Sequence, residues 1–281
     1  MSLSSKATRT LIRSHHQLQK AHSKAVREGD AVTAAAIEQQ IQEQGGLKTY
    51  QKASITGQST ERGGDSSRVL MKWLNPVIHP DIINGGAGRG RADTSRRDKF
   101  RMLEVGALST ANACSRSSLF SVTRIDLNSQ GPGIEQQDFM ERPLPASDTE
   151  RFDIISLSLV LNYVPDAAER GEMLRRTCSF MRSYSDAAGE QSSRGNQVKL
   201  FPSLFLVLPA PCVTNSRYMD AARLERVMES LGYQLLEQKM SAKLFYYLWR
   251  YSGHEPKLRN AFSKVEVNPG KTRNNFTIVL R

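Results

Sequence analysis

The sequence predicts an α/β fold in which helices cover both faces of a doubly wound, mainly parallel sheet of seven strands. After residue 101, short apolar runs typical of strands alternate with segments that have helical periodicity. The first run, 102–105, ends at Gly106, and the next, 122–126, ends at Asp126. A strand, a glycine turn and an acid about 20 residues later are typical of a nucleotide-binding βαβ unit. An ordinary buried strand with a glycine at its exit is the alternative.

The chain is basic, and its positive charge is concentrated in the front part. The net charge of the 281 residues is +11 at pH 7. Residues 1–101 hold 17 Lys and Arg against nine Asp and Glu, a net +8, which leaves +3 for the other 180 residues. This distribution favours a polyanion such as nucleic acid as a partner of the front part. A solvated basic surface is the alternative.

The apolar runs and the cysteines argue against several classes of protein. No run approaches the roughly 20 apolar residues that a membrane span requires, so we expect no membrane insertion. No apolar segment follows Met1 as it would in a signal peptide, so we do not expect secretion. The three cysteines are odd in number and far apart, which favours a reducing compartment and argues against a metal site.

A small N-terminal helical region, residues 1–80, is expected to precede the α/β domain. Residues 3–27 and 31–44 have helical patterns, and Gly29-Asp30 between them fits a helix stop followed by an N-cap. These patterns predict an αα-hairpin. The first helix carries three histidines without neighbouring acids or thiols, so we expect them on the surface rather than in a metal site. They are His15, His16 and His22.

The polar, glycine-rich segment 45–67 has a structural interpretation as a cap and turn. Asp65 or Ser66 can cap a short helix, 67–73, which Pro76 is expected to terminate. In this interpretation the segment serves only to start the helix.

A second interpretation makes the same segment a lid over a ligand. Arg62 would then pair with a carboxylate or a phosphate of the substrate or cofactor. Residues 81–100 follow as a flexible basic linker. Their glycine-rich part, 84–90, is not a phosphate loop, because no strand precedes it and no helical pattern follows it.

The α/β domain, residues 101–281, is expected to contain its strands and helices in regular alternation. Strands are predicted at 102–105, 122–126, 134–139, 152–161, 204–208 and 233–239, with a β-prone segment at 243–250 and a last strand at 276–280. Helices are predicted to open in the small, polar residues after Gly106 and to span 166–182 and 219–231, and residues 183–199 are a low-complexity surface loop.

Four short motifs follow one another in the α/β domain: LEVG (103–106), ID (125–126), QD (137–138) and FDIISLSLVLNYVP (152–165). Their order resembles the class I S-adenosylmethionine-dependent methyltransferases, which have a Rossmann-like fold. Longer segments are YQKASITGQ (50–58), RGGDSS (62–67), IDLNSQ (125–130), QDFMERPLP (137–145), SLSLVLNYVPDAAERGEML (156–174) and LFLVLPAPCVTNSRY (204–218). These segments are similar to the fungal family of large-subunit (25S) rRNA adenine-N(1) methyltransferases, and they span most of residues 45–250.

The resemblance implies S-adenosyl-L-methionine as the cofactor and assigns five residues to it. It makes Gly106 the cofactor-binding glycine and Asp126 the acid that binds the ribose. The wider class I pattern places Glu104 near the methionine end of the cofactor and Asp138 with Phe139 near its adenine ring.

The chain departs from the class I pattern at two places. After Gly106, residues 107–109 stand where further glycines are usual, which leaves the path of this turn open. After the fourth strand, adenine amino-group methyltransferases typically carry a Pro-Pro-aromatic run, whereas this chain has Asn-Tyr-Val-Pro at 162–165. We hypothesise that Asn162 hydrogen-bonds the target base and that Tyr163 stacks on it. A strand-end turn with a packed tyrosine is the alternative.

The resemblance implies an enzyme that methylates N(1) of an adenine in 25S rRNA during ribosome biogenesis. The implied partner is large-subunit rRNA in pre-ribosomal particles, without a metal, and the implied location is the nucleus and nucleolus. The fungal family shares its ancestry with an animal S-adenosylmethionine sensor of nutrient signalling, so a non-catalytic regulator that docks a partner protein is the alternative. The basic front part favours the enzyme. An NAD-dependent enzyme is disfavoured because the glycine fingerprint is missing.

Overall fold

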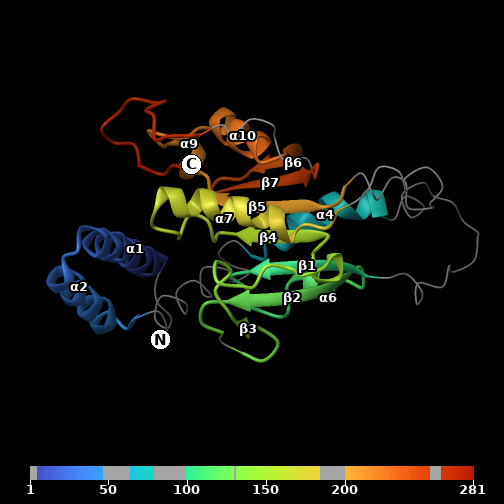
Figure 1. The fold of residues 1–281 in the computed structure, drawn as a ribbon, viewed down its shortest axis with the longest axis horizontal. Helices are drawn as coiled ribbons and strands as arrows, with labels where there is room; N and C mark the ends of the chain where they lie inside the picture. Colours follow the sequence, from blue (N-terminus) through green and yellow to red (C-terminus); the bar gives the residue numbers. More distant parts are fainter. Residues whose placement is uncertain (1–4, 47–63, 79–98, 130, 184–199, 254–260) are drawn as a thin grey trace, which may run out of the picture.

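The computed structural model describes residues 5–46, 64–78, 99–129, 131–183, 200–253 and 261–281. Arg62 and most of the two segments 81–100 and 183–199 lie outside the described residues. The described part forms one seven-stranded sheet with helices on both faces and a pair of helices at one edge (Figure 1). None of the described helices is both long and apolar enough to cross a membrane.

The strands follow the order β3-β2-β1-β4-β5-β7-β6 across the sheet. They are β1 (Phe100–Val105), β2 (Phe120–Asp126), β3 (Glu135–Gln136), β4 (Ile154–Ser158), β5 (Ser203–Pro209), β6 (Tyr233–Met240) and β7 (Leu244–Tyr251). The strands from β3 to β5 in this order are parallel to one another, and β7 is antiparallel to both β5 and β6. The prediction of a mainly parallel, seven-stranded sheet is confirmed.

The register brings the carboxyl ends of three neighbouring strands to one level. Val105, the last residue of β1, is paired with Ile125 of β2 on one side and with Leu157 of β4 on the other. Gly106, directly after β1, and Asp126, the last residue of β2, therefore meet at the same edge of the sheet. In open α/β sheets this edge is where ligands bind.

The helices described after residue 64 agree with most of the predicted ones. They are α4 (Ser67–Ile78), α6 (Ala113–Arg116), a 3₁₀ turn (Asp148–Glu150), α7 (Ala167–Phe180), α9 (Pro211–Thr214) and α10 (Ala221–Ser230). The helices predicted at 166–182 and 219–231 correspond to α7 and α10. The predicted end of α4 at Pro76 is wrong, since the helix continues to Ile78. A proline in the last turn of a helix removes only one backbone hydrogen bond.

Two buried clusters hold these helices on opposite faces of the sheet. Leu103 and Ile155 belong to the cluster that contains the buried side chains of α7 and α10. Their chain neighbours Met102 and Ile154 belong to the other cluster, which contains Leu70 and Leu74 of α4. Successive side chains of β1 and β4 thus point to opposite faces, and both faces are apolar. This burial confirms the doubly wound arrangement.

The prediction that a helix opens directly after Gly106 is wrong in position. Residues 107–112 form a loop, and only the four residues of α6 after it are helical. Within the loop, the Ser109 hydroxyl accepts a hydrogen bond from the backbone N–H of Ala111 at 3.0 Å. Such local side-chain bonds compete with helix formation. The sheet face that carries Met102 and Ile154 is covered by α4, which precedes β1 in the chain.

Residues 276–280 form no strand, so the last predicted strand is wrong. Their backbone lies along α7, where Val279 N donates to Ala167 O at 2.8 Å and Arg170 donates to Thr277 O at 2.6 Å. The buried side chains of this segment are Phe276, Thr277, Ile278 and Leu280. Burial against a helix therefore accounts for the apolar segment that suggested a strand, and β7 completes the sheet.

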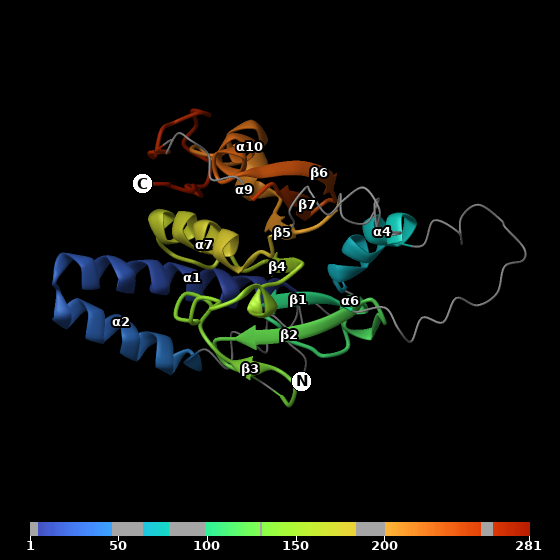
Figure 2. The same cartoon turned by 45° about the vertical axis from the view of Figure 1, so that its right-hand side comes forward.

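The N-terminal hairpin is confirmed as α1 (Ser5–Glu28) and α2 (Ala31–Glu43), with Asp30 as the N-cap of α2. The hairpin lies at the carboxyl edge of the sheet, toward which the arrowheads of β1 and β2 point (Figures 1 and 2). Arg27 of α1 forms an ion pair with Asp166, which is the N-cap of α7. This pair connects the hairpin to the α/β domain.

The prediction that the α1 histidines lie on the surface is wrong for His15. Its side chain is 5% exposed, and this burial lowers its pKa because desolvation disfavours the charged ring. His22 is half-buried, and the side chain of His16 is outside the described part. The described residues contain no group of three or more His, Cys, Asp or Glu that could hold a metal ion.

The packing of the C-terminal segment on α7 can be tested at Gly171. A Cβ atom at this position would clash with the backbone carbonyl of Val279. We expect Gly171→Ala to lower the free energy of unfolding by about 1–3 kcal/mol, the usual range for overpacking, measured by urea denaturation. Gly131→Ala is the control, since its added Cβ meets no atom within 4 Å. An unchanged midpoint for Gly171→Ala would contradict this packing.

Candidate functional site

A cavity of about 320 Å³ opens at the carboxyl edge of β1, β2 and β4. This volume lies within the range of small-molecule sites. Five of the residues predicted from the sequence line it: Gly106, Asp126, Asp138, Phe139 and Tyr163. They come from positions up to 57 residues apart in the chain, and the parallel register of the strands brings them together.

Gly106 has a conformation and an environment that require glycine. Its φ angle is +73°, and a Cβ atom at this position would lie 2.6 Å from Cγ2 of Val160. The backbone N–H groups of Gly106 and Ala107 both donate to the carbonyl of Ile125, at 2.9 and 3.1 Å. The turn after β1 is therefore tied to the end of β2, and its backbone can approach a ligand closely.

Asp126 lies at the end of β2 in the wall of the cavity. Its Oδ1 accepts the backbone N–H of Asn128 at 2.9 Å, and its carbonyl accepts the N–H of Gln137 at 2.9 Å. These bonds hold the side chain and the start of the next segment in one place. A carboxylate held in this way can accept the two hydroxyls of a ribose.

Asp138 and Phe139 form the adjoining part of the cavity wall. Asp138 Oδ1 accepts the backbone N–H of Met140 at 2.7 Å, which closes a tight turn. The Phe139 ring is 2% exposed and lies 5.4 Å from the ring of Phe180, while its carbonyl accepts a bond from Arg176 at 2.8 Å. Phe139 is thus anchored in the core where it borders the cavity.

The turn after β4 carries backbone strain at the cavity. Leu159 lines the cavity with a φ angle of +59°, which is uncommon for a residue other than glycine. Its N–H donates to Val207 O of β5 at 2.9 Å, and the N–H of Tyr163 donates to Val160 O at 2.9 Å. These bonds hold the strained turn, and Tyr163 is half-buried in the cavity wall.

Asn162 is not among the residues that line the cavity. Its Oδ1 atom is buried and has no hydrogen-bond partner among the described residues. A buried carbonyl oxygen without a partner is costly, so a donor that reached it would stabilise this turn. The role of Asn162 in holding a target base stays a prediction.

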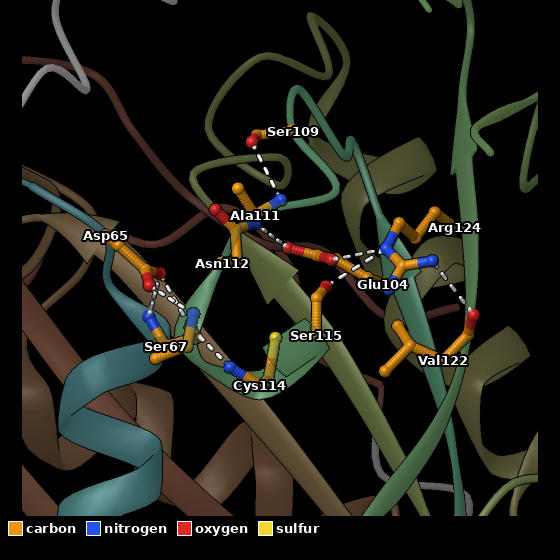
Figure 3. A network of polar contacts seen from close by, with 11 residues as sticks. Asp65, Ser67, Glu104, Ser109, Ala111, Asn112, Cys114, Ser115, Val122 and Arg124 are labelled. Atoms are coloured by element: carbon orange, nitrogen blue, oxygen red, sulfur yellow. Dashed lines mark hydrogen bonds and ion pairs between the residues drawn. The ribbon is translucent and has the colours of Figure 1, made fainter. Parts of the chain in front are cut away.

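Glu104 lies beside the cavity rather than in its wall. Asn112 Nδ2 donates to Oε1 at 2.6 Å, and Arg124 Nε lies 4.0 Å from Oε2, which has no hydrogen-bond partner among the described residues. Figure 3 shows the carboxylate turned toward Asn112 and Arg124. Burial raises the pKa of Glu104 from 4.5 to about 7, although the Asn112 bond and the Arg124 charge act in the opposite direction.

The structure adds residues to the cavity that the sequence did not single out. Gln19 enters from α1, and Glu169 and Met173 enter from α7. Ser158, the last residue of β4, could have been found from the rule that ligands bind at the carboxyl ends of strands. Gln19 had no such signal, because the docking of α1 depends on contacts between distant parts of the chain. Arg62, the expected lid residue, lies outside the described residues.

The chain is similar to proteins that modify ribosomal RNA. The family model for 25S rRNA (adenine(2142)-N(1))-methyltransferases matches residues 35–278. The chain is 37% identical over 247 residues to the 25S rRNA (adenine(2142)-N(1))-methyltransferase of Saccharomyces cerevisiae. This match covers 87% of the chain but 63% of the yeast protein, so the chain spans less than two thirds of that relative.

A second relative is matched over nearly its whole length. The 25S rRNA adenine-N(1) methyltransferase of Schizosaccharomyces pombe is 36% identical over 268 residues, which covers 95% of this chain and 89% of that protein. Among solved structures, the O-methyltransferase NcsB1 from neocarzinostatin biosynthesis, in complex with S-adenosylmethionine, has a TM-score of 0.45. It is 14% identical and covers 86% of this chain and 70% of that chain, which is too low a similarity to bear on the site.

The raised pKa of Glu104 predicts a pH dependence of stability. Between pH 4.5 and about 7 the folded protein binds more protons at this group than the unfolded chain does. Its stabilising contribution is therefore complete below pH 4.5 and is lost as the pH rises through about 7. We expect Glu104→Gln to remove a decline on the order of 3 kcal/mol across this window, measured by urea unfolding of the protein without ligand.

The matched control is Glu135→Gln, which changes an exposed glutamate of β3. It is expected to keep the wild-type slope of unfolding free energy against pH. A Glu104→Gln variant with that same slope would contradict the burial of an ionisable carboxyl at this position.

Proposed function

The chain belongs to the family of 25S rRNA (adenine(2142)-N(1))-methyltransferases, and from this membership we propose that it is an S-adenosylmethionine-dependent methyltransferase. The proposed reaction methylates N(1) of an adenine in large-subunit rRNA. The observation that supports it best is the cavity, which is lined by a glycine without room for a Cβ atom, by an acid at the end of a strand and by aromatic residues.

The residues of the cavity fit S-adenosyl-L-methionine. Gly106 allows the cofactor to approach the backbone, and Asp126 is placed to accept the ribose hydroxyls. Asp138 and Phe139 would border the adenine ring. Glu104 would act near the methionine end, and its buried Oε2 without a hydrogen-bond partner among the described residues supports this role. The bound cofactor supplies an electrophilic methyl group.

The proposed reaction requires the protein to align the base with the methyl group of the cofactor, and it requires no proton transfer. Adenine N(1) has an available lone pair, so it needs no prior deprotonation, and the main task is to hold the base in line with the methyl group. N(1) lies on the Watson–Crick edge, so the base must be unpaired or flipped out. Tyr163 would stack on the base, and the Asn162 amide would hydrogen-bond its edge after a rotation into the cavity.

The basic front part of the chain bears on the substrate and on the location of the enzyme. We infer that the enzyme acts on pre-ribosomal particles during ribosome biogenesis and is located in the nucleus, in the nucleolus. The net charge of +8 in residues 1–101 supports contact with the phosphate backbone of RNA. A non-catalytic S-adenosylmethionine sensor would share the cavity, and methyl transfer to RNA distinguishes the two functions.

Transfer of a labelled methyl group tests the proposed function directly. The purified protein is incubated with labelled S-adenosyl-L-methionine and rRNA, or pre-ribosomal particles, from cells that lack this activity. We expect labelled 1-methyladenosine in the large-subunit RNA after nucleoside analysis. Binding of the cofactor without any labelled nucleoside on either substrate would overturn the enzyme in favour of the sensor.

Asp126 is predicted to be required for cofactor binding. We expect Asp126→Ala to raise the dissociation constant of S-adenosylhomocysteine by at least about tenfold, because the loss of charge-assisted bonds to two hydroxyls costs about 1.5–3 kcal/mol. Calorimetry measures the affinity, and circular dichroism checks that the fold is intact. Glu135→Ala is the control, since this acid lies in the neighbouring strand but does not line the cavity. Wild-type affinity in Asp126→Ala would refute the ribose site.

Tyr163 and Asn162 are predicted to act on the target base and not on the cofactor. We expect Tyr163→Ala and Asn162→Ala to lower methyl transfer roughly ten- to hundredfold, the factor that corresponds to loss of base stacking, while cofactor affinity stays normal. Tyr163→Phe should retain most of the activity, because it keeps the ring. Unchanged turnover in both alanine variants would show that this turn is only structural.

A further inference from the structure

Asp65 and Ser67 connect the start of α4 to the end of the loop that follows Gly106. The Oδ1 atom of Asp65 accepts bonds from the backbone N and the hydroxyl of Ser67, at 2.9 and 2.6 Å. Its Oδ2 atom accepts the backbone N–H of Ala113 at 2.5 Å. One carboxylate therefore binds the first turns of both α4 and α6, and Asp65 and Ala113 lie 48 residues apart in the chain. Figure 3 shows the carboxylate directed at Ser67, which in turn is joined to Cys114.

Ser67 adds a second bond of the same kind. Its hydroxyl accepts the backbone N–H of Cys114 at 3.1 Å while donating to Asp65, and the residue is 5% exposed. Two consecutive N–H groups at the start of α6 are thus satisfied by the side chains of Asp65 and Ser67, which lie at the start of α4. These bonds hold the start of α6, which itself has only four residues.

Hydrogen bonds therefore fix the loop 107–112 at both of its ends, and a third bond fixes the side chain of Asn112 within it. At its start, Gly106 N donates to the Ile125 carbonyl at 2.9 Å, and at its end Ala113 is held by Asp65. Between them, the side chain of Asn112 donates to Glu104 at 2.6 Å. A loop with these three anchors has little freedom, so its backbone is set before a ligand arrives.

The same segment also reaches the end of β4. The hydroxyls of Ser66 and Ser158 are 2.8 Å apart, and Ser158 lines the cavity. Leu108 of the held loop lines it as well. Residues 65–67 therefore contact two of the walls of the cavity although they do not line it themselves.

We propose that Asp65 is a positioning residue that holds the loop 107–112 in the conformation that binds the cofactor. The inference rests on the proposed function, since the ligand is an S-adenosyl nucleoside. If Asp65 were only a helix cap, it would bind α4 alone. It also binds the first residue of α6, and it thereby fixes the end of the loop 107–112. Asp65 acts through the backbone of this loop and does not touch the ligand.

The substitution Asp65→Asn separates positioning from general stability. An amide keeps the size of the carboxylate, but its NH₂ group must face either Ala113 N–H or the Ser67 donors, so one bond becomes a contact between two donors. The matched control is Asp220→Asn. Asp220 caps α10 by accepting the N–H of Arg223 at 2.7 Å, and it does not line the cavity.

Titration calorimetry with S-adenosylhomocysteine is the first measurement, with the thermal unfolding midpoint of each protein beside it. We expect Asp65→Asn to raise the dissociation constant about tenfold, the factor that loss of one charge-assisted hydrogen bond represents. Asp220→Asn should keep wild-type affinity and an unfolding midpoint near that of the wild type, because the amide oxygen can still accept the single N–H bond. Equal affinity in Asp65→Asn and wild type, or equal loss in both variants, would overturn the inference.

Kinetics provides a readout that a stability defect would not produce. In Asp65→Asn we expect the KM for S-adenosyl-L-methionine to rise about tenfold while kcat at saturating cofactor stays near wild type, because the loop is displaced but still able to close on the ligand. A lower kcat with unchanged KM would overturn the inference, as it indicates a smaller folded fraction.

Ser67→Ala keeps the inference testable if Asp65→Asn fails to fold. It removes only the bonds of the hydroxyl to Asp65 and Cys114, and we expect a two- to fivefold weaker affinity, corresponding to about one neutral hydrogen bond. Unchanged affinity in Ser67→Ala would overturn the inference in that case. If wild-type protein binds S-adenosylhomocysteine but Asp65→Asn binds it equally well, only this inference fails. Absence of binding by the wild-type protein would overturn the proposed function together with it.

Discussion

The close approach of the turns after β1 and β4 determines the form of the carboxyl edge. Gly106 leaves no room for a side chain, because a Cβ atom there would lie 2.6 Å from Val160. On the other side of this contact, Leu159 takes a strained, left-handed conformation held by a bond to Val207 of β5. The turn after β1 and the turn after β4 therefore fix each other's position. The cavity lies at these two turns, and its wall includes Asp126 and Tyr163. Loss of the contact between Gly106 and Val160 would change the shape of the cavity, even if the ligand-binding side chains themselves were unchanged.

Polar groups near these turns lose contact with water on folding, and hydrogen bonds within the protein offset the free-energy cost of this desolvation. Glu104 is buried with its pKa raised to about 7, and it retains a bond from Asn112 and the nearby charge of Arg124. Asp65 satisfies donors of α4 and α6 together. Buried polar groups that are paired in this way specify one arrangement of the backbone around them. The preorganisation of the site thus depends on Glu104 and Asp65, which do not line the cavity themselves.

The sequence predicted the sheet and much of the cavity because both follow from local patterns. Buried strands are continuous apolar runs, and the ends of parallel strands meet, so Gly106 and Asp126 could be expected together. Asp138 and Phe139 were assigned to the site only by the family resemblance. Features that depend on long-range packing were missed. The apolar segment 276–280 packs on α7 instead of joining the sheet, and Gln19 reaches the cavity only because α1 docks beside it. No pattern around Asn162 indicated that this residue would not line the cavity.

The most direct test of this account is a crystal structure of the protein with S-adenosylhomocysteine. We predict that the ligand occupies the cavity, with its ribose hydroxyls within hydrogen-bond distance of Asp126 and its chain passing the backbone of Gly106. Tyr163 should border the open side, where the target base would enter. A ligand bound elsewhere, or in the cavity without contact to Asp126 and Gly106, would contradict the assignment of this edge as the cofactor site.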